Sequence, residues 1–243
     1  NGVFDGHGGG DISAWLVNTL KISKYFCDKN SHIYNRLDKN SSNKSIVELF
    51  ERIQESLKNY NTKSNNMGST ALISLIYPRN NKTCNLKAIC LGDCRMILCN
   101  KYNIANSLTL DHKPHLLVDK YRIKKSGGTI EFSSNDDPRI DGLSVSRSFG
   151  DNDAKHVSHI PDIFDYVISD DDKFIVMGCD GLYDVLSNQE IADIVLESML
   201  MSKTKLQDFK NKSPKNIAYI LSQIAMEKGS TDNISIIIIF ISP

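Results

Sequence analysis

Short apolar runs that resemble buried β-strands follow one another along much of this sequence. They lie at Gly2–Phe4, Thr70–Tyr77, Leu86–Leu91, Arg95–Cys99, Ile163–Ile168, Phe174–Cys179 and Ile234–Ile241. Several are apolar at successive positions, which is typical of strands covered on both faces. Because helices do not alternate regularly with these runs, a doubly wound parallel sheet is disfavoured. The pattern favours an α+β fold with helices packed on a mostly antiparallel sheet or sandwich.

Helical periodicity is equally clear outside the strand block. One apolar stripe consists of Ile46, Leu49, Phe50, Ile53 and Leu57, and another of Ile217, Ile220, Leu221 and Ile224. Ser187 and Glu190 form a capping box that predicts a helix through Met199. Ser213-Pro214 is expected to open the last helix and Gly229 to end it. A further helix is expected to begin at Asp11. Polar stretches at Lys39–Lys44, Asn59–Asn66 and Arg79–Asn85 predict loops or insertions.

Length and charge limit the classes of protein to consider. With 243 residues, 40% of them hydrophobic, the chain can bury one substantial core, and we expect a single domain over residues 1–243. The net charge of zero argues against a nucleic-acid partner bound through a positive field. The longest apolar run, Ile234–Ile241, is far below the ~20 residues of a membrane span. Since the chain starts with Asn1 and not Met, we expect it to be N-terminally incomplete.

Six cysteines raise the question of a zinc site. Cys90, Cys94 and Cys99 lie in "LKAICLGDCRMILC", which predicts a strand, a Gly-Asp turn and a second strand. No His stands beside them at ligand spacing, and structural zinc sites use closer Cys pairs. We therefore expect buried thiols in a reducing compartment.

The glycine-rich stretch "VFDGHGGG", Val3 to Gly10, allows several interpretations that the rest of the sequence excludes. An esterase oxyanion loop would require a Gly-x-Ser-x-Gly elbow, and the nearest match, Gly142–Ser146, lacks the closing Gly. A dinucleotide loop would require a third Gly at the position of Asp11, in a parallel βαβ setting. Two other phosphatase chemistries fail on spacing. Cys90 and Arg95 have four residues between them where Cys-x₅-Arg is needed, and the spacing from Asp180 to Asp184 does not match Asp-x-Asp.

Aspartates recur at the ends of the apolar runs. Asp5, Asp93 and Asp180 each follow such a run, Asp184 comes one turn after Asp180, and Asp232 precedes the last run. A single Asp beside Gly is usually a turn residue, but five with this placement can gather at one edge of a sandwich. Unit charges ~4 Å apart repel by about 4 kcal/mol at an effective dielectric near 20, so cations are expected to hold them. Oxygen ligands favour Mg²⁺ or Mn²⁺, and the pattern predicts a binuclear, carboxylate-bound metal site.

Several motifs together resemble the metal-dependent type-2C serine/threonine protein phosphatases. They are "VFDGHGG", "LGDCR", "LTLDHKP", "SGGTI", "LSVSRSFGD", "GCDGLYDVL" and "GSTDNISIIII", in the family's order. The similarity spans Val3 to Phe240, and it implies a central antiparallel β-sandwich flanked by α-helices in αββα layers. It also implies metal-dependent hydrolysis of phosphoserine and phosphothreonine in phosphoprotein substrates.

The resemblance assigns roles to the residues that match the motifs. Asp5 would bridge two Mn²⁺ or Mg²⁺ ions, the Gly6 carbonyl would bind one of them, and Asp180 and Asp232 would complete the first ion. Asp93 and Asp184 resemble ligands of a weaker third ion. A water bridging the ions would attack phosphorus in line. His7 would act as general acid toward the serine or threonine oxygen.

The sequence also departs from the family pattern. The family has a further strand before "VFDGHGG" that carries acidic metal ligands and a phosphate-binding Arg, and we expect it upstream of Asn1. Cys94 replaces the usual serine of "GDSR", and Asp119 stands where Glu is frequent. Arg147 is interpreted as a structural salt-bridge partner and not as a phosphate ligand. "DNDAK" from Asp151 lacks the Gly and Glu of a calcium loop. The alternative function is a pseudophosphatase, a binding module of the same fold.

The metal hypothesis has a geometric consequence. The strands before Asp5 and Asp180 should run roughly parallel, and the strand after Asp232 should run opposite to them. The three carboxylates should then lie within about 6 Å of one another, given Mg²⁺–oxygen distances of about 2.1 Å. We also expect a monomer in the cytoplasm, with the nucleus as the alternative location.

Overall fold

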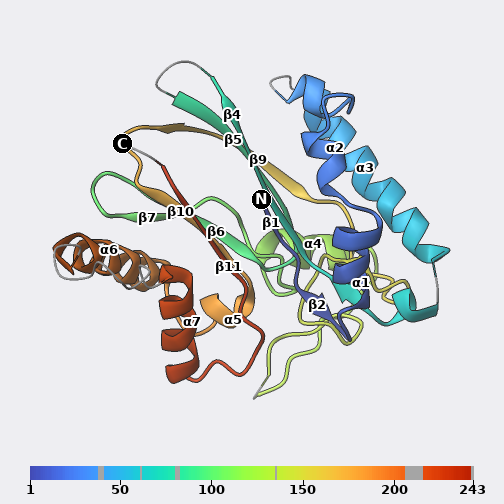
Figure 1. The fold of residues 1–243 in the computed structure, drawn as a ribbon. Helices are drawn as coiled ribbons and strands as arrows, with labels where there is room; N and C mark the ends of the chain where they lie inside the picture. The colour runs from blue at the N-terminus through green and yellow to red at the C-terminus, as the bar shows by residue number, and fades with distance from the viewer. Residues whose placement is uncertain (38–40, 61, 80–82, 135, 206–215, 242–243) are drawn as a thin grey trace.

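Two four-stranded antiparallel sheets face each other at the centre of the computed structural model, which describes residues 1–37, 41–60, 62–79, 83–134, 136–205 and 216–241 (Figure 1). The first sheet has the order β1-β4-β5-β9, with β1 Gly2–Val3, β4 Ala71–Pro78, β5 Thr83–Leu91 and β9 Asp162–Ser169. The second has the order β11-β10-β6-β7, with β6 Arg95–Cys99, β7 Ala105–Ser107, β10 Phe174–Gly178 and β11 Ile236–Phe240. A small third sheet pairs β2 Gly6–His7, β3 Gly68–Ser69 and β8 Phe149–Gly150. The predicted sandwich is confirmed.

Helices cover the outer face of each large sheet (Figure 1). On the first sheet lie α1 Asp11–Ala14, a π-helical turn at Trp15–Thr19, α2 Ser23–Cys27 and α3 Ser41–Lys58. On the second lie α5 Asp180–Tyr183, α6 Asn188–Lys205 and α7 Ile217–Glu227. Short 3₁₀ turns occur at Tyr34–Arg36 and Thr62–Asn65, and α4 Leu117–Lys125 belongs to the long connection between β7 and β8. The layers are therefore αββα.

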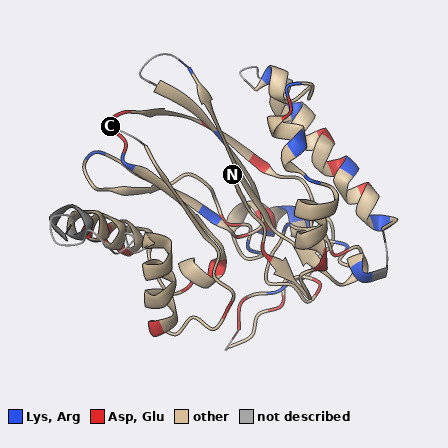
Figure 2. Ribbon diagram, in the orientation of Figure 1, with Lys and Arg blue, Asp and Glu red and all other residues tan. Residues whose placement is uncertain are grey.

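Alternate residues of one strand pack into different hydrophobic layers. In β10, Val176 packs against the helices of the second sheet, while Ile175 and Met177 pack between the two sheets. In β4, Leu72 points between the sheets and Ile73 points toward α3. Both faces of these strands are buried, which explains why the runs are apolar at successive positions. Figure 2 shows the same division, because charged residues lie on helices and around strand ends while the central strands are mostly uncharged.

The helix ends follow the predicted capping chemistry where the structure describes them. Ser187 N donates to Glu190 Oε2 at 2.9 Å, and Glu190 N donates to Ser187 Oγ at 3.3 Å, as in a capping box. This helix continues to Lys205 and is longer than predicted. Gly229, at φ +98°, follows the end of α7 as predicted. The predicted start at Ser213-Pro214 lies outside the described residues, and Asn216 caps α7 by accepting from Ala218 N.

The predicted loops require correction. Residues 41–44 of the polar stretch Lys39–Lys44 form the first turn of α3, because Ser and Asn are well tolerated at a helix start and the apolar stripe follows directly. Thr62–Asn65 is a 3₁₀ turn within Asn59–Asn66. Residues 83–85 of Arg79–Asn85 begin β5, where they pair with residues 167–169 of β9.

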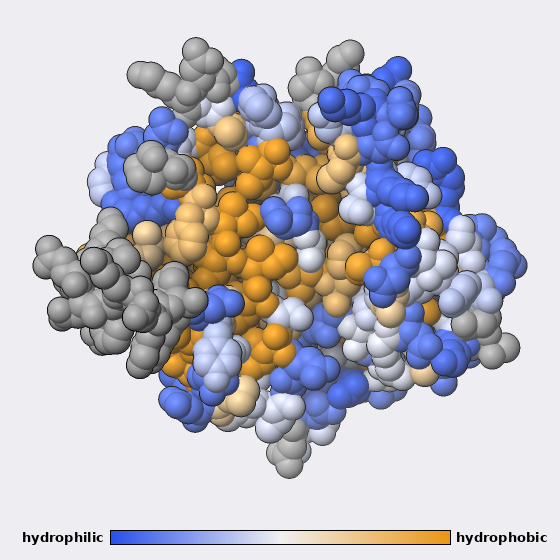
Figure 3. Space-filling model, in the orientation of Figure 1, coloured by the Kyte–Doolittle hydropathy of each residue, from blue (hydrophilic) through white to orange (hydrophobic). Residues whose placement is uncertain are grey.

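The sandwich is open on the side seen in Figure 3, where apolar side chains gather over the central strands. β1 is an edge strand of the first sheet, and β11 is an edge strand of the second. A groove separates them and is lined by Val3, Val17 and Ile237, among others. No helix among the described residues is both long and apolar enough to cross a membrane.

Candidate metal centre

The ends of strands from different sheets bring Asp5 and Asp180 together. Figure 1 shows β1 and β10 running toward the same end of the sandwich, where β11 begins. The register of β10 and β11 is antiparallel, with Gly178 opposite Ile236. Ligand atoms of Asp5, Cys179 and Asp180 all lie within 4.8 Å of one another. The predicted strand directions are therefore observed, and one edge of the fold collects the acidic residues.

Asp232 reaches the same edge from the segment before β11. A Cβ added to Gly181 would lie 2.6 Å from the carbonyl oxygen of Asn233 and 3.3 Å from Asp232 Cβ. Glycine at position 181 thus allows the turn after Asp180 to approach the Asp232 backbone closely. Burial raises the pKa of both Asp5 and Asp180, and the charge of Asp232 adds a smaller increase to each. Asp232 itself is exposed and does not belong to the group within 4.8 Å.

Asp93 and Asp184 form the other side of the centre, beside a lysine. Asp93 is buried, and its Oδ2 lies 2.6 Å from Lys113 Nζ. Asp184 follows Asp180 by one helical turn, since Asp184 N donates to the Asp180 carbonyl at 2.8 Å. Burial raises the pKa of Asp184, the Lys113 charge opposes this, and the Asp93 charge adds to it. The charges of the two carboxylates and of the ammonium therefore influence one another's protonation.

Repulsion among these carboxylates contributes to raised pKa values. Burial and, after it, the neighbouring charge of Asp180 together raise the pKa of Asp5 from 3.8 to about 7. Burial also raises the pKa of Asp180, with the charge of Asp184 as the next cause. A cluster of this kind binds protons or cations more readily than isolated carboxylates do.

The residues present suit a hard divalent cation. Oδ1 of Asp180 is buried, and no residue in the described part of the chain makes a hydrogen bond to it. Asp5 and Asp180 offer oxygen ligands, which Mg²⁺ and Mn²⁺ prefer. Burial raises the pKa of Cys179 to about 11, so its sulfur remains a thiol that accepts from Ser235 N at 3.2 Å. Asp5, with Gly6 next to it in β2, Asp180 and Asp232 could hold one or two such ions.

Thr70 holds the backbone of Asp5 in place. Thr70 N donates to the Asp5 carbonyl at 2.8 Å, and Asp5 N donates to Thr70 Oγ1 at 3.1 Å. The same hydroxyl lies 3.1 Å from the buried Sγ of Cys94, the residue that departs from the family's usual serine. A thiol therefore keeps the polar contact that the serine would make.

His7 pairs with an aspartate from a distant loop. His7 Nε2 lies 2.6 Å from Asp151 Oδ2, and Ser148 Oγ donates to the same oxygen. A Cβ on Gly68 would lie 2.0 Å from Asp151 Oδ2 and 2.3 Å from His7 Nε2, so only glycine leaves room for this pair. Burial of the His7 ring lowers its pKa, but the hydrogen bond to Asp151 and the charges of Asp151, Asp93 and Asp5 outweigh burial and raise it. No local sequence pattern predicts this contact, because Asp151 is distinguished in the sequence only as the start of "DNDAK", which lacks the Gly and Glu of a calcium loop.

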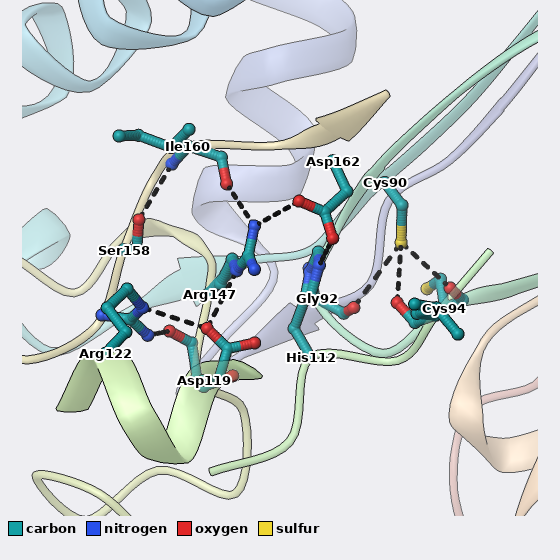
Figure 4. A network of polar contacts seen from close by, with 12 residues as sticks. Cys90, Gly92, Cys94, His112, Asp119, Arg122, Arg147, Ser158, Ile160 and Asp162 are labelled. Carbon is teal, nitrogen blue, oxygen red and sulfur yellow. Dashed lines mark hydrogen bonds and ion pairs between the residues drawn. The ribbon is translucent and has the colours of Figure 1, made fainter. Parts of the chain in front are cut away.

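A polar network includes Gly92, the residue before Asp93 (Figure 4). Arg147 donates to Asp119 Oδ1 at 3.0 Å and to Asp162 Oδ1 at 2.8 Å. His112 Nδ1 accepts from Gly92 N at 3.0 Å, so Nε2 carries the proton and donates to Asp162 Oδ2 at 3.1 Å. The network thus connects Arg147 to the turn that presents Asp93. Arg147 is buried in ion pairs, as its structural interpretation requires.

Comparison with known proteins agrees with the motifs. The sequence model of the family described as protein phosphatase 2C matches residues 1–234. A mimivirus protein named as PP2C-like domain-containing is 42% identical over 172 residues, which cover 65% of this chain and 95% of that protein. A probable protein phosphatase 2C of rice is 32% identical over 251 residues, covering 98% of this chain and 60% of the rice protein. Several curated plant and rodent relatives are longer, and the matched regions cover 56% to 66% of them.

Solved structures share the fold. A sex-determining protein of C. elegans superimposes with a TM-score of 0.74 at 25% identity, covering all of this chain and 56% of that chain. A serine-threonine phosphatase 2C from Toxoplasma gondii gives a TM-score of 0.73 at 20% identity, covering 98% and 83% of the two chains. Together with the match over residues 1–234, these similarities establish that the chain belongs to the protein phosphatase 2C family.

Proposed function

We propose that the protein to which this chain belongs hydrolyses phosphoserine and phosphothreonine in phosphoprotein substrates, with two Mn²⁺ or Mg²⁺ ions at the acidic centre and a weaker third. The observation that carries the proposal is the approach of Asp5, Cys179 and Asp180 within 4.8 Å, delivered from strands of both sheets. Relatives that match nearly the whole chain are named as protein phosphatases, which supports the reaction class.

The acidic residues would share the work of holding the cations. Asp5, the Gly6 carbonyl, Asp180 and Asp232 would bind the two tighter ions, and Asp93 with Asp184 the weaker one. Bound Mn²⁺ or Mg²⁺ supplies an acidified water and neutralises charge on the phosphate. Asp180 Oδ1, which is buried and accepts no hydrogen bond from the described residues, is available to such a cation. Proton uptake by Asp5, whose pKa is raised, competes with this binding.

His7 would donate a proton to the departing serine or threonine oxygen. Its ring stands two residues after Asp5, and about a quarter of its surface is exposed (27%), so it can face both the centre and solvent. Asp151 fixes the ring through Nε2 and favours the protonated form, which a general acid requires. An alkoxide is a poor leaving group, so protonation at this position accelerates the step.

A pseudophosphatase binding module of the same fold is the alternative, and it is not favoured. A module without turnover has no need for a histidine held beside a cluster of carboxylates. The named relatives also point toward catalysis.

Phosphopeptide hydrolysis with and without metal tests the proposal. We expect release of phosphate from a phosphothreonine peptide with Mn²⁺ or Mg²⁺ and no release after exhaustive chelation. Asp180→Asn should reduce the rate strongly at saturating Mn²⁺, while Asp170→Asn, an exposed aspartate after β9, serves as the matched control. Full activity in chelator would contradict metal dependence, and no activity of the full-length protein under any metal condition would favour the binding module.

A further inference from the structure

Three consecutive residues hold the segment around Asp93 in place through hydrogen bonds and an ion pair. Asp111 accepts from Arg95, with Nη2 and Oδ2 2.5 Å apart. His112 exchanges two hydrogen bonds with Gly92, one through its own backbone N–H and one through Nδ1. Lys113 then places its ammonium against Asp93. Hydrogen bonds therefore fix the backbone that carries Asp93 relative to the backbone that carries Lys113. The Lys113 side chain extends toward the acidic centre from this fixed segment.

The Lys113 ammonium is held among acidic groups. Its Nζ lies 2.6 Å from Asp93 Oδ2 and 3.4 Å from Asp137 Oδ2. The Lys113 side chain is 13% exposed and that of Asp93 is 3% exposed, so water screens the pair weakly. The charge of Asp184 acts on the same ammonium. Lys113 thus faces the two carboxylates that would hold the weaker cation.

A lysine in this position changes what the carboxylates can bind. An ammonium and a divalent cation cannot share Asp93 Oδ2 at contact distance without strong repulsion, because little solvent separates them. The four-carbon stem of lysine has enough rotatable bonds for the ammonium to leave toward solvent. A pocket lined by Lys113, Asp137 and Asp184 opens beside the pair and offers that space.

We propose that Lys113 is a built-in counter-cation of the Asp93 and Asp184 side of the centre, which a divalent ion there must displace. Lys113 consequently weakens the third cation site most, because it is in contact with Asp93, while its charge also acts on Asp180. This inference rests on the proposed metal centre and adds to it the residue that sets the order in which its cations bind.

Calorimetric titration of the chain with Mn²⁺ tests the proposal without any activity measurement. In the wild-type chain we expect a tight class of sites and a weaker class. In Lys113→Met the affinity of the weaker class should increase about tenfold or more, which corresponds to about 1.4 kcal/mol or more. The affinity of the tight class should change much less, because Lys113 contacts Asp93 and acts on Asp180 only through its charge. Lys101→Met is the matched control, because it removes a lysine paired with Asp171 at 2.9 Å on the surface and should change neither class.

A second variant assigns the gain to the predicted ligand. Adding Asp93→Asn to Lys113→Met should abolish the increase in affinity. An unchanged weaker class in Lys113→Met would overturn the role of Lys113 while leaving the tight sites intact. The absence of any Mn²⁺ binding in the wild-type chain and in Lys113→Met would overturn the metal centre itself, and with it this inference.

Amine labelling of the wild-type chain gives a test that does not depend on the folding of a variant. Lys113 should react slowly with an amine-specific reagent in chelator, because it is largely buried and ion-paired. Its labelling, followed by mass spectrometry, should increase as Mn²⁺ fills the weaker class, while Lys101 should label equally throughout. Labelling of Lys113 that stays constant or falls over this range would contradict displacement.

Discussion

Asp151 is separated from His7 by 144 positions in the sequence, yet its Oδ2 lies 2.6 Å from His7 Nε2. The backbone at Asp151 has φ +47°, a left-handed conformation, and its N–H donates to the Met67 carbonyl at 3.0 Å. The neighbouring Gly150, at φ +81°, pairs with Gly68 across β8 and β3. The small third sheet therefore holds the loop of Asp151 beside His7, because β3 pairs with both β2 and β8.

Replacing His7 tests its role as proton donor. His7→Ala should slow hydrolysis of a phosphoserine peptide by about 10²–10⁴-fold, the usual contribution of general acid catalysis. An aryl phosphate needs little protonation of its leaving group, so its hydrolysis should fall much less. Both rates are measured at saturating Mn²⁺. Equal losses on the two substrates would exclude the general-acid role.

Removing the charge of Asp151 should change the pH dependence of the reaction. Burial lowers the pKa of His7, while Asp151 raises it, so Asp151→Asn should lower that pKa. The acid form of His7 then disappears at lower pH, and the alkaline limb of the rate profile for a phosphoserine peptide should move to lower pH. The control is Asp141→Asn, which alters an equivalent pair with His156 at 3.0 Å on the surface. A profile that does not move would show that Asp151 has no influence on the reacting proton.

Gly68 should be intolerant of any side chain. In Gly68→Ala the new methyl would collide with Asp151 Oδ2 and His7 Nε2, which are part of the pair. We expect the same selective loss on alkyl phosphates as in His7→Ala, together with reduced stability. Gly10→Ala is the control, because nothing lies within 4 Å of its added Cβ and its φ is not positive. Wild-type rates in Gly68→Ala would be inconsistent with this packing.

Stability without metal should depend on the protonation of Asp5. Burial and the charges of Asp180, Asp232 and Asp93 raise its pKa from 3.8 to about 7. A carboxyl whose pKa is higher in the folded state contributes stability below its ordinary pKa and loses it as pH rises through the folded value. In chelator this contribution should therefore disappear between about pH 4 and pH 7. Asp5→Asn should melt at a higher temperature than wild type at pH 8, by about 2–4 °C for each 1 kcal/mol of relieved repulsion, and not at pH 4.

Thermal melts at the two pH values check this, with the exposed Asp170→Asn as control. Saturating Mn²⁺ should reverse the order at pH 8, because wild type can bind the cation through Asp5. A variant that is no more stable than wild type at pH 8 in chelator would mean that the cluster is not repulsive.

Arg147 should matter for stability and not for the choice of substrate. It is buried and paired with Asp119 and Asp162, so Arg147→Ala would leave each carboxylate with one charged partner fewer. Breaking a buried pair in this way costs about 3–5 kcal/mol of unfolding free energy. Arg139→Ala removes an exposed pair with Asp136 and should cost less than about 1 kcal/mol. Denaturant unfolding measures both, and a small loss in Arg147→Ala with a large rise in KM would indicate a phosphate ligand instead.

The sequence predicted the long buried strands well because both faces of each are apolar. It missed β7, whose Ala105–Ser107 is a polar edge strand without a hydrophobic pattern. It also missed α4, where the usual pattern of buried apolar and exposed charged side chains is reversed. Leu117 and Tyr121 are exposed there, while Asp119 is buried against Arg147. Where ion pairs take the place of apolar packing, the hydrophobic periodicity of the sequence does not predict the helix.

For the site, residues at strand ends could be predicted and residues on long loops could not. Asp5 and Asp180 occupy positions whose location follows from the sheet, and their approach was expected. Lys113 and Asp151 reach the centre through loops whose course depends on tertiary contacts such as those of His112 and Gly68. Local patterns do not encode these contacts.

The sandwich has two unlike ends, and this makes one of them suitable for chemical attachment. Ala71 pairs with Leu91 near the acidic edge, whereas Pro78 pairs with Cys84 at the opposite end, and β6 likewise runs from Arg95 away to Cys99. The turn after β6 carries the exposed Lys101. A five-residue strand spans roughly 17 Å, so a fluorophore or a biotin on this turn would be separated from the carboxylates by at least that length. Immobilised through it, the molecule would present its acidic end to the solution.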